Sequence, residues 1–143
     1  MKKYFYKNKE GFSIIEVMVA FIILSISFIG LMQSFPFGLS VNKDAENETV
    51  SSYLVQEKIE ELISLGYGEI DTGIVEEKHR LSEDAFNFLY NFQRETEVYY
   101  VDEDLANSIS DLGIKKIAVT VYFPNAISKE EKSYNITTLI SER

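Results

Sequence analysis

Residues 11–37, GFSIIEVMVAFIILSISFIGLMQSFPF, decide how this chain is organised. From Val17 to Phe37 the stretch has 21 residues without a charge, and 15 of them are apolar. As an α-helix this run would be about 30 Å long, at roughly 1.5 Å per residue, which is enough to cross the hydrocarbon core of a bilayer. A buried helix in a small domain normally carries a polar stripe, and this run has none. We therefore predict a membrane-spanning helix over residues 12–37.

The residues before the apolar run predict its orientation. Residues 1–11 contain four lysines and one glutamate. Positive charges beside a short N-terminal tail are retained in the cytoplasm, so we expect residues beyond about 40 to lie outside the cell membrane. Without residues 1–11 the formal net charge changes from −9 to −12. An outer part this acidic argues against direct binding to nucleic acid and against docking on anionic lipid.

After the apolar run, in which Pro36 can kink or end the helix, the pattern predicts an amphipathic helix and then strands. Residues 38–66 are read as an amphipathic extension of the helix, with Gly66 and Gly68 supplying the stop. Residues 92–101, 114–123 and 134–141 alternate as strands do, and the polar loop between the last two predicts an antiparallel hairpin. We interpret residues 69–91 as a connecting region and expect little regular structure before Phe86.

The expected core lies between this helix and these strands. Its members are Val50, Leu54 or Val55, Ile59, Leu62 and Ile63 in the helix, and Phe92, Val98, Tyr100, Ile117, Val119, Val121, Phe123, Tyr134, Ile136 and Ile140 in the strands. We predict an α+β fold, in which a long N-terminal helix packs on a small antiparallel β-sheet. The predicted division is a leader over 1–11, a membrane or filament-core helix over 12–37, the extension over 38–66 and a globular extracytoplasmic domain over 67–143.

Glu16 is the unusual residue of the apolar stretch. A carboxylate near the middle of a bilayer costs about 2.5–3.5 kcal/mol, so it needs a partner. Lys43 is too distant along a helix, and the lysines of the leader belong in the cytoplasm. A cut between Gly11 and Phe12 would create a new α-amine, on the same molecule or on an adjacent one. The other interpretation is a helix-end acid that reaches back to the membrane interface.

The segment KEGFSIIEVMVAFIIL, residues 9–24, resembles the N-terminus of type IV prepilins and of type II secretion pseudopilins. Their signature is a short basic leader ending in Gly, then Phe, three mostly apolar residues, Glu and a long apolar helix. Gly11, Phe12 and Glu16 match it. The resemblance implies cleavage between Gly11 and Phe12 by a prepilin peptidase, N-methylation of Phe12, and a role for Glu16 in assembly through the N-terminal amine of a neighbouring subunit.

Two further segments are similar to minor pilins and minor pseudopilins: VQEKIEELISLGYGEI (55–70) and KKIAVTVYF with KSYNITTLISER (115–123, 132–143). The chain departs from many pilins in having no cysteine, so its C-terminal region must be held by sheet pairing. The resemblance implies a structural, minor subunit of a type IV pilus-like filament. Its implied partners are other pilin or pseudopilin subunits, the prepilin peptidase and methylase, an inner-membrane assembly platform, and lipid before assembly.

Three alternatives remain open. The chain could be a pseudopilin of a type II secretion or competence DNA-uptake system. It could be a monomeric membrane-anchored domain that binds a ligand outside the cell. The N-terminus could also be an ordinary signal peptide or anchor, because SIS (25–27) and GLS (38–40) are small-residue tripeptides of the kind a general signal peptidase cuts. In the preferred reading the chain is a single-pass cell-membrane protein that later enters a surface pilus or pseudopilus.

No motif predicts an enzyme, a cofactor or a metal site. His79 is the sole histidine, and no partner for catalysis or metal binding accompanies it. The acids of residues 102–111 lack the ligand spacing and central glycine of a calcium loop, so we interpret them as a solvated loop. Aromatic residues at 99–100 and 122–123 either form an exposed binding patch or, by alternation, place half of their number in the core.

Overall fold

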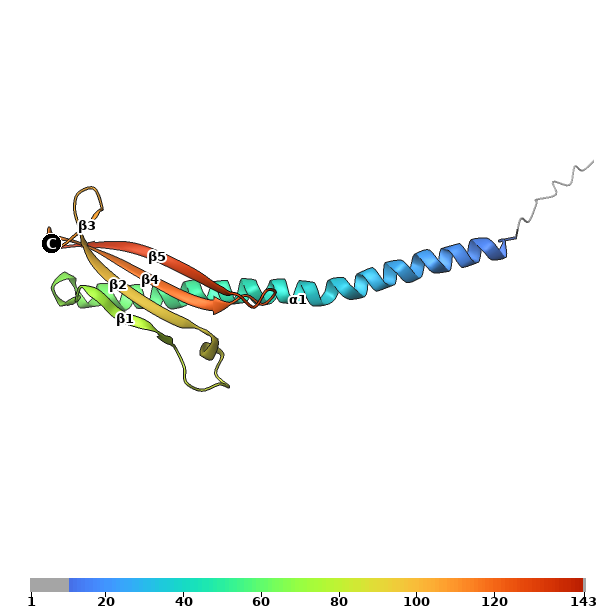
Figure 1. Cartoon of the computed structure of the whole chain (residues 1–143), viewed down its shortest axis with the longest axis horizontal. Helices are drawn as coiled ribbons and strands as arrows, with labels where there is room; N and C mark the ends of the chain where they lie inside the picture. Colours follow the sequence, from blue (N-terminus) through green and yellow to red (C-terminus); the bar gives the residue numbers. More distant parts are fainter. Residues whose placement is uncertain (1–10, 143) are drawn as a thin grey trace, which may run out of the picture. The chain divides into compact units, whose positions relative to one another are not determined.

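The computed structural model describes residues 11–142. Its elements, in chain order, are α1 (Ile14–Leu65), the 3-10 helix η1 (Tyr67–Glu69), β1 (Gly73–Arg80), the 3-10 helix η2 (Phe88–Asn91), β2 (Gln93–Val101), β3 (Asn107–Ser108), β4 (Ile114–Pro124) and β5 (Glu131–Ser141) (Figure 1). The chain divides into two compact units, residues 1–39 and residues 40–143.

The described part of the first unit consists of residues 11–13 and the beginning of α1. Helix α1 continues through Pro36, so this proline does not end the helix. The hydroxyls of Ser25, Ser27 and Ser34 each donate a hydrogen bond to the carbonyl four residues earlier, at 2.8–3.0 Å. Such bonds satisfy a hydroxyl within the helix, which is how serine is tolerated where no water is at hand. In the described residues one helix, α1, is long and apolar enough to cross a membrane.

The second unit is a helix packed on a sheet. Residues 40–65 of α1 run along one face of the sheet, whose strand order is β1-β2-β4-β5 (Figure 1). All strand pairs are antiparallel, and the short β3 pairs with the end of β2. The β4–β5 pair runs without a break from Ile114↔Ser141 to Pro124↔Glu131, which confirms the predicted hairpin. The predicted α+β fold, a long N-terminal helix on a small antiparallel sheet, is confirmed.

The core lies between the helix and the strand residues of one parity. Val55, Ile59 and Leu62, spaced by four and three, present one stripe of α1 to the sheet and are buried. Their buried partners are Ile70, Phe92, Val98, Ile117, Val119, Val121 and Phe123, and the partly buried Val50, Leu54, Tyr134, Ile136 and Ile140 pack against them. Ile63 was expected in this stripe, but its side chain is 46 % exposed because position 63 has turned away from the sheet.

Strand β1 is where the sequence interpretation is wrong, because residues 73–80 lie inside the region expected to have little regular structure. The strand pairs antiparallel with β2, and its register shifts twice, between Ile74 and Glu76 and between Glu76 and His79. These irregularities break the two-residue alternation on which a strand is recognised. Gly73 begins the strand at φ +103°, a conformation that suits glycine.

The aromatic residues near 99 and 122 divide between the two faces of the sheet. Phe123 is buried in the core, 6.3 Å from the ring of Phe92. Tyr122, one residue away, lies on the opposite face, where its hydroxyl donates to the Glu95 carboxylate at 2.8 Å. This hydrogen bond, with some burial, raises the pKa of the Tyr122 phenol to about 12. The interpretation that alternation places half of these residues in the core holds for this pair.

Candidate functional site

The candidate site is the junction that precedes α1, defined by Gly11, Phe12 and Glu16. Gly11, Phe12 and Ser13 lie outside the helix, which begins at Ile14. The carbonyl of Ser13 accepts the first helical hydrogen bonds, from the N–H groups of Glu16 at 3.0 Å and Val17 at 3.2 Å. The Gly11–Phe12 peptide bond therefore precedes the first helical turn, and both of its residues are exposed. A peptidase binds its substrate as an open chain, and this bond meets that requirement without unwinding of the helix.

Nothing in the described structure requires glycine at position 11. A Cβ atom built on Gly11 would have no atom within 4 Å, and its backbone is not in the left-handed region that favours glycine. A side chain would therefore fit here as far as the fold is concerned.

Glu16 lies in the first turn of α1. The unpaired N–H groups of a helix N-terminus carry partial positive charge, so a carboxylate is favoured in this turn. Within residues 11–142 no ion pair involves Glu16. Its pairing with the amine of a processed Phe12 stays a prediction, and so do the cleavage and methylation of this junction. The leader predicted over 1–11 lies, apart from Gly11, outside the described residues.

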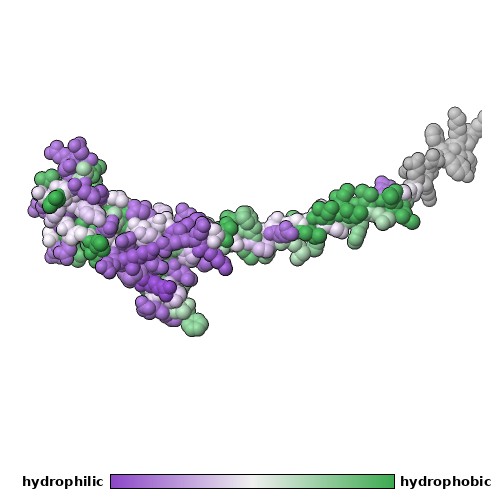
Figure 2. Space-filling view, in the orientation of Figure 1, coloured by the Kyte–Doolittle hydropathy of each residue, from purple (hydrophilic) through white to green (hydrophobic). Residues whose placement is uncertain are grey.

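The helix surface that follows the junction is apolar and uncovered. None of the most apolar 18-residue window of α1 is buried. Phe21, for example, is 69 % exposed, and Figure 2 shows hydrophobic side chains gathered along this part of the helix. Exposed apolar surface of this extent is stable only against lipid or against other apolar helices. The geometry thus provides a surface for burial in a membrane or in a bundle, beside the exposed Gly11–Phe12 bond and one carboxylate.

Two features considered for chemistry make local contacts in the second unit. The Asp102 carboxylate accepts the backbone N–H groups of Asp104 at 3.0 Å and Ala106 at 2.9 Å, so it shapes its own turn. His79 lies on β1, its Nε2 atom 3.4 Å from Glu76 and its Nδ1 atom 2.9 Å from the Glu77 carbonyl oxygen. No group of three or more metal-binding side chains occurs in the part of the chain that the structure describes.

Lys115 is a structural residue that the sequence interpretation missed. Its side chain is buried, and its ammonium group donates to the carbonyls of Tyr67 at 2.7 Å and Ile70 at 2.8 Å. The Tyr67 hydroxyl donates to Asp111. Burial and this hydrogen bond raise the pKa of Tyr67, and the same bond lowers the pKa of Asp111. The signal was available, because position 115 shares the parity of the core residue Ile117.

A second missed cluster lies between β1 and β2. Arg94 donates to both carboxylate oxygens of Glu76, with Nη2–Oε1 at 3.0 Å, and Thr96 donates to Glu76 at 2.8 Å. Burial alone would raise the pKa of Glu76, but the hydrogen bonds from Arg94 and Thr96 outweigh it and the net shift is downward. These residues were not recognised because β1 itself was not.

A third polar contact holds the β4–β5 loop to α1. The Asp44 carboxylate accepts from Lys132 Nζ at 2.7 Å and from the backbone N–H of Ala126. The hydrogen bond from Lys132 is the main reason that the pKa of Asp44 is lowered. Asn47, one turn further along the helix, donates from Nδ2 to the Pro124 carbonyl at 3.2 Å. The helix is thus held to the hairpin from the first turns of the second unit.

Comparison with known families gives one match. Residues 6–32 match the model of the prokaryotic N-terminal methylation motif. This is the prepilin-type signature, and it contains the whole candidate junction. A search of curated proteins and a search of solved structures gave no match. The chain is therefore pilin- or pseudopilin-like in its N-terminal region, and the match does not extend to the second unit.

Proposed function

We propose that this chain is a structural, minor subunit of a type IV pilus-like filament. In this proposal a prepilin peptidase cuts between Gly11 and Phe12, and Phe12 is then N-methylated. The observation that carries the proposal is the match of residues 6–32 to the methylation motif, next to an apolar window of α1 that is unburied within the described residues. Both parts are needed, because the motif accounts for processing and the bare helix for assembly.

The chain would act by polymerisation and not by catalysis. Before assembly, lipid covers the apolar side chains of α1, and the chain is a single-pass membrane protein with its C-terminal unit outside the cell membrane. During assembly at an inner-membrane platform, the helices of other pilin or pseudopilin subunits replace the lipid. The apolar surface stays buried throughout, so little hydrophobic free energy opposes the transfer.

Glu16 would select the assembled state over the isolated one. An unpaired carboxylate costs about 2.5–3.5 kcal/mol at the centre of a membrane-spanning helix, and Glu16, in the first turn of α1, bears a part of this cost. The amine that cleavage creates on Phe12 of a neighbouring subunit offers a partner of opposite charge. A residue that is unfavourable alone and satisfied beside a neighbour favours lateral association and fixes its register.

A pseudopilin of a type II secretion or DNA-uptake system would use the same junction and the same helix, so the observations support it nearly as well. A monomeric membrane-anchored binding domain would not need a motif for N-terminal methylation. It would also leave Glu16 without a partner. For these reasons we prefer an assembling subunit.

Photo-cross-linking in the host cell tests assembly. The chain has no cysteine, so a Met18→Cys variant offers a single thiol for a benzophenone probe, at a position 59 % exposed on the apolar helix. A filament subunit gives cross-links to other polypeptides that carry the same type of N-terminal helix. Adding Glu16→Ala should reduce these products, whereas adding Glu60→Ala, an exposed acid of the second unit, should not. Cross-links to lipid alone in the parent variant would refute an assembling subunit.

A further inference from the structure

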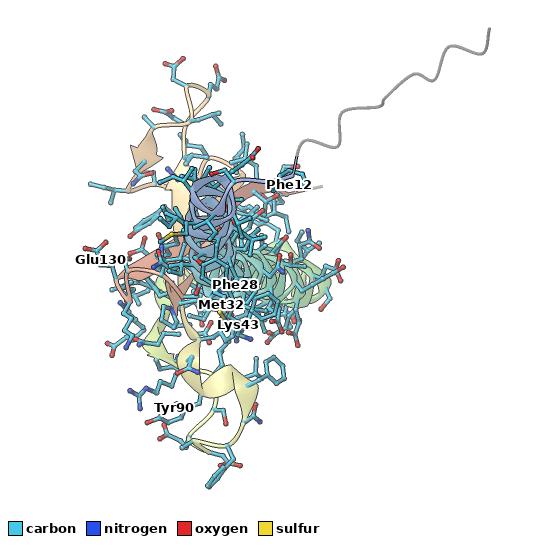
Figure 3. All side chains as sticks on the ribbon, turned by 90° about the vertical axis from the view of Figure 1, so that its right-hand side faces the viewer. Phe12, Phe28, Met32, Lys43, Tyr90 and Glu130 are labelled. Carbon is cyan, nitrogen blue, oxygen red and sulfur yellow. The ribbon has the colours of Figure 1, made fainter. Side chains whose placement is uncertain are left out.

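Strand β5 forms one edge of the sheet in the second unit, and no described strand pairs with its outer side (Figure 1). It is 11 residues long and pairs with β4 without a register shift. Glu130, labelled in Figure 3, directly precedes this strand and is exposed. A long, regular edge presents a row of backbone N–H and C=O groups that can pair with a further strand.

The backbone groups that point outward from β5 belong to its odd-numbered residues. At one end of the β4–β5 ladder, Asn125 N–H donates to the Glu130 carbonyl at 2.8 Å, and at the other end Glu142 N–H donates to the Gly113 carbonyl at 2.9 Å. Hydrogen-bonded pairs alternate with non-bonded pairs along an antiparallel ladder, so the even-numbered residues of β5 bond to β4. The N–H and C=O groups of the odd-numbered residues, Thr137 among them, therefore point away from β4.

The middle of β5 lacks the features that usually protect a sheet edge. Residues 133–141, SYNITTLIS, contain no charged residue, no proline and no glycine. They are rich in β-branched side chains, which favour an extended backbone. An edge of this kind pairs with other strands unless something covers it.

The direction of the strands decides which strand of a second copy can continue the sheet. Three antiparallel steps separate β1 from β5, so these two edge strands run in opposite directions. A second copy whose sheet points the same way presents its β1 antiparallel to β5 of the first. Two β5 strands, by contrast, pair antiparallel only between copies that point in opposite directions.

The two edges present matching apolar side chains. Ile74, near the beginning of β1, is 60 % exposed, and Leu139, near the end of β5, is 46 % exposed. Both lie on the face of the sheet that points away from the core, because they pair with the outward-facing Glu97 and Lys116. The antiparallel arrangement of β1 beside β5 brings these two ends together, so the side chains become cross-strand neighbours on one face.

The charges at the other ends of the two strands are complementary. Arg80 is the last residue of β1 and Glu131 is the first residue of β5, and both are exposed. The arrangement that joins Ile74 to Leu139 also brings these opposite charges toward each other. Opposite charges on adjacent strands favour one pairing over its alternatives.

We propose that β5 of one copy pairs with β1 of a second copy of this chain, so that the sheets of neighbouring copies join edge to edge. This inference rests on the proposed function, since a filament holds its subunits in one direction, which is the condition for β1–β5 pairing. The contact is heterologous, because each copy contributes a different edge on each side. It therefore leaves a free edge for a further copy, and backbone hydrogen bonds add to the helix contacts between subunits.

Cysteine cross-linking tests this pairing, because the chain has no cysteine of its own. The full-length Ile74→Cys/Leu139→Cys variant is expressed in the host, and isolated membranes and filaments are oxidised with copper phenanthroline. Within one chain the two positions are three strand spacings apart, about 14 Å. A disulfide needs Cα atoms within about 7 Å, so disulfides must join different copies. The expected result is a ladder of dimers, trimers and longer products on non-reducing electrophoresis.

Thr137 offers a matched pair of further substitutions. Thr137→Pro, added to the double-cysteine variant, removes an outward N–H and leaves the hydrogen bonds to β4 in place, so the ladder should be lost while the near-ultraviolet circular dichroism is kept. Thr137→Ala keeps the N–H and should keep the ladder. Leu139→Cys combined with Ile109→Cys moves one thiol to an exposed position between β3 and β4 and should give no ladder.

Absence of a ladder in the Ile74→Cys/Leu139→Cys variant, or its persistence after Thr137→Pro, would overturn the inference. Dimers formed by Leu139→Cys alone would mean that β5 pairs with β5 between inverted copies, which also contradicts it. The Met18→Cys probe separates this inference from the proposed function. Helix cross-links without the ladder would overturn the edge pairing alone, whereas the absence of both would overturn the assembling subunit as well.

Discussion

Lys115 on β4 donates a hydrogen bond from its ammonium group to the backbone carbonyl of Tyr67, 2.7 Å away, in a buried setting. The same ammonium group lies 4.3 Å from the centre of the Tyr67 ring. Tyr67 begins η1, directly after α1. The Lys115 side chain therefore provides a hydrogen-bond donor for backbone carbonyls in the segment that connects α1 to β1. It holds this segment, at the end of α1, against β4.

Replacing Lys115 by Met should destabilise the second unit by about 2–4 kcal/mol, because it removes charged hydrogen bonds and leaves buried carbonyls unpaired. Urea unfolding of the full chain in detergent micelles, followed by the near-ultraviolet circular dichroism of its tyrosines, measures this change. Lys116→Met is the matched control, since Lys116 lies on the outer face and donates to the exposed Asn107 side chain. It should cost about 0.5 kcal/mol or less. Equal losses in both variants would contradict the role assigned to Lys115.

Acid should weaken the second unit through Glu76. The pKa of this carboxyl is lowered in the folded state, so its contribution to stability is present above its ordinary value of 4.5 and is lost as pH falls through the folded pKa. Glu76→Gln should be less stable at neutral pH and should lose less on acidification. Unfolding free energies measured between pH 7 and pH 3 test this. Glu60→Gln, a change of the same charge on the exposed face of α1, should keep the acid dependence of the parent chain.

The helix–sheet core should respond strongly to a cavity at its centre. Ile117 has no exposed surface and lies in the core cluster of the second unit. Ile117→Ala should cost about 2–5 kcal/mol of unfolding free energy, from lost burial and the cavity left behind. Ile109→Ala removes the same atoms from a fully exposed position and should be nearly neutral. A small effect at position 117 would mean that the helix and sheet are not packed as described.

Gly11 should matter for processing and not for folding. No atom lies within 4 Å of a Cβ built at this position, so Gly11→Leu should leave the unfolding free energy unchanged. It should nevertheless keep residues 1–11 attached in cells, which a mass increase on gel electrophoresis and intact-mass analysis would show. Gly68→Leu, at another glycine with open space, should be processed as the parent chain is. If the Gly11→Leu variant matured normally, the assignment of the cleavage site to the Gly11–Phe12 bond would be wrong.

The sequence predicted the parts of the fold whose burial follows a simple period. The spacing of Val55, Ile59 and Leu62 and the alternation from Ile117 to Phe123 each repeat without a break, because each of these segments has one buried face. The membrane-spanning helix was predicted from the absence of such a period, since residues 17–37 carry no charge and no polar stripe. The junction was recognised from the fixed spacing of Gly11, Phe12 and Glu16 within a signature.

The remaining parts depend on contacts that no local pattern encodes. Strand β1 is an edge strand with two register shifts, and it is held by pairing with β2, so its own residues carry no clear period. The clusters around Glu76 and Lys115 join residues separated by 18 and 48 positions, respectively. Phe86 lies in a loop whose sequence follows neither a helical nor a strand period. Its full exposure depends on the conformation of the turn, which the sequence pattern does not predict.

The central claim is that cleavage creates an N-terminus at Phe12. The proposed ion pair of Glu16 with a neighbouring subunit depends on the amine of this N-terminus. The most direct test is the intact mass, with N-terminal fragments, of the protein isolated from the membranes of its host. The account predicts a chain that begins at Phe12 and carries one added methyl group on its α-amine. A chain that begins at Met1 or Lys2, or one cut after residues 25–27 or 38–40, would contradict it.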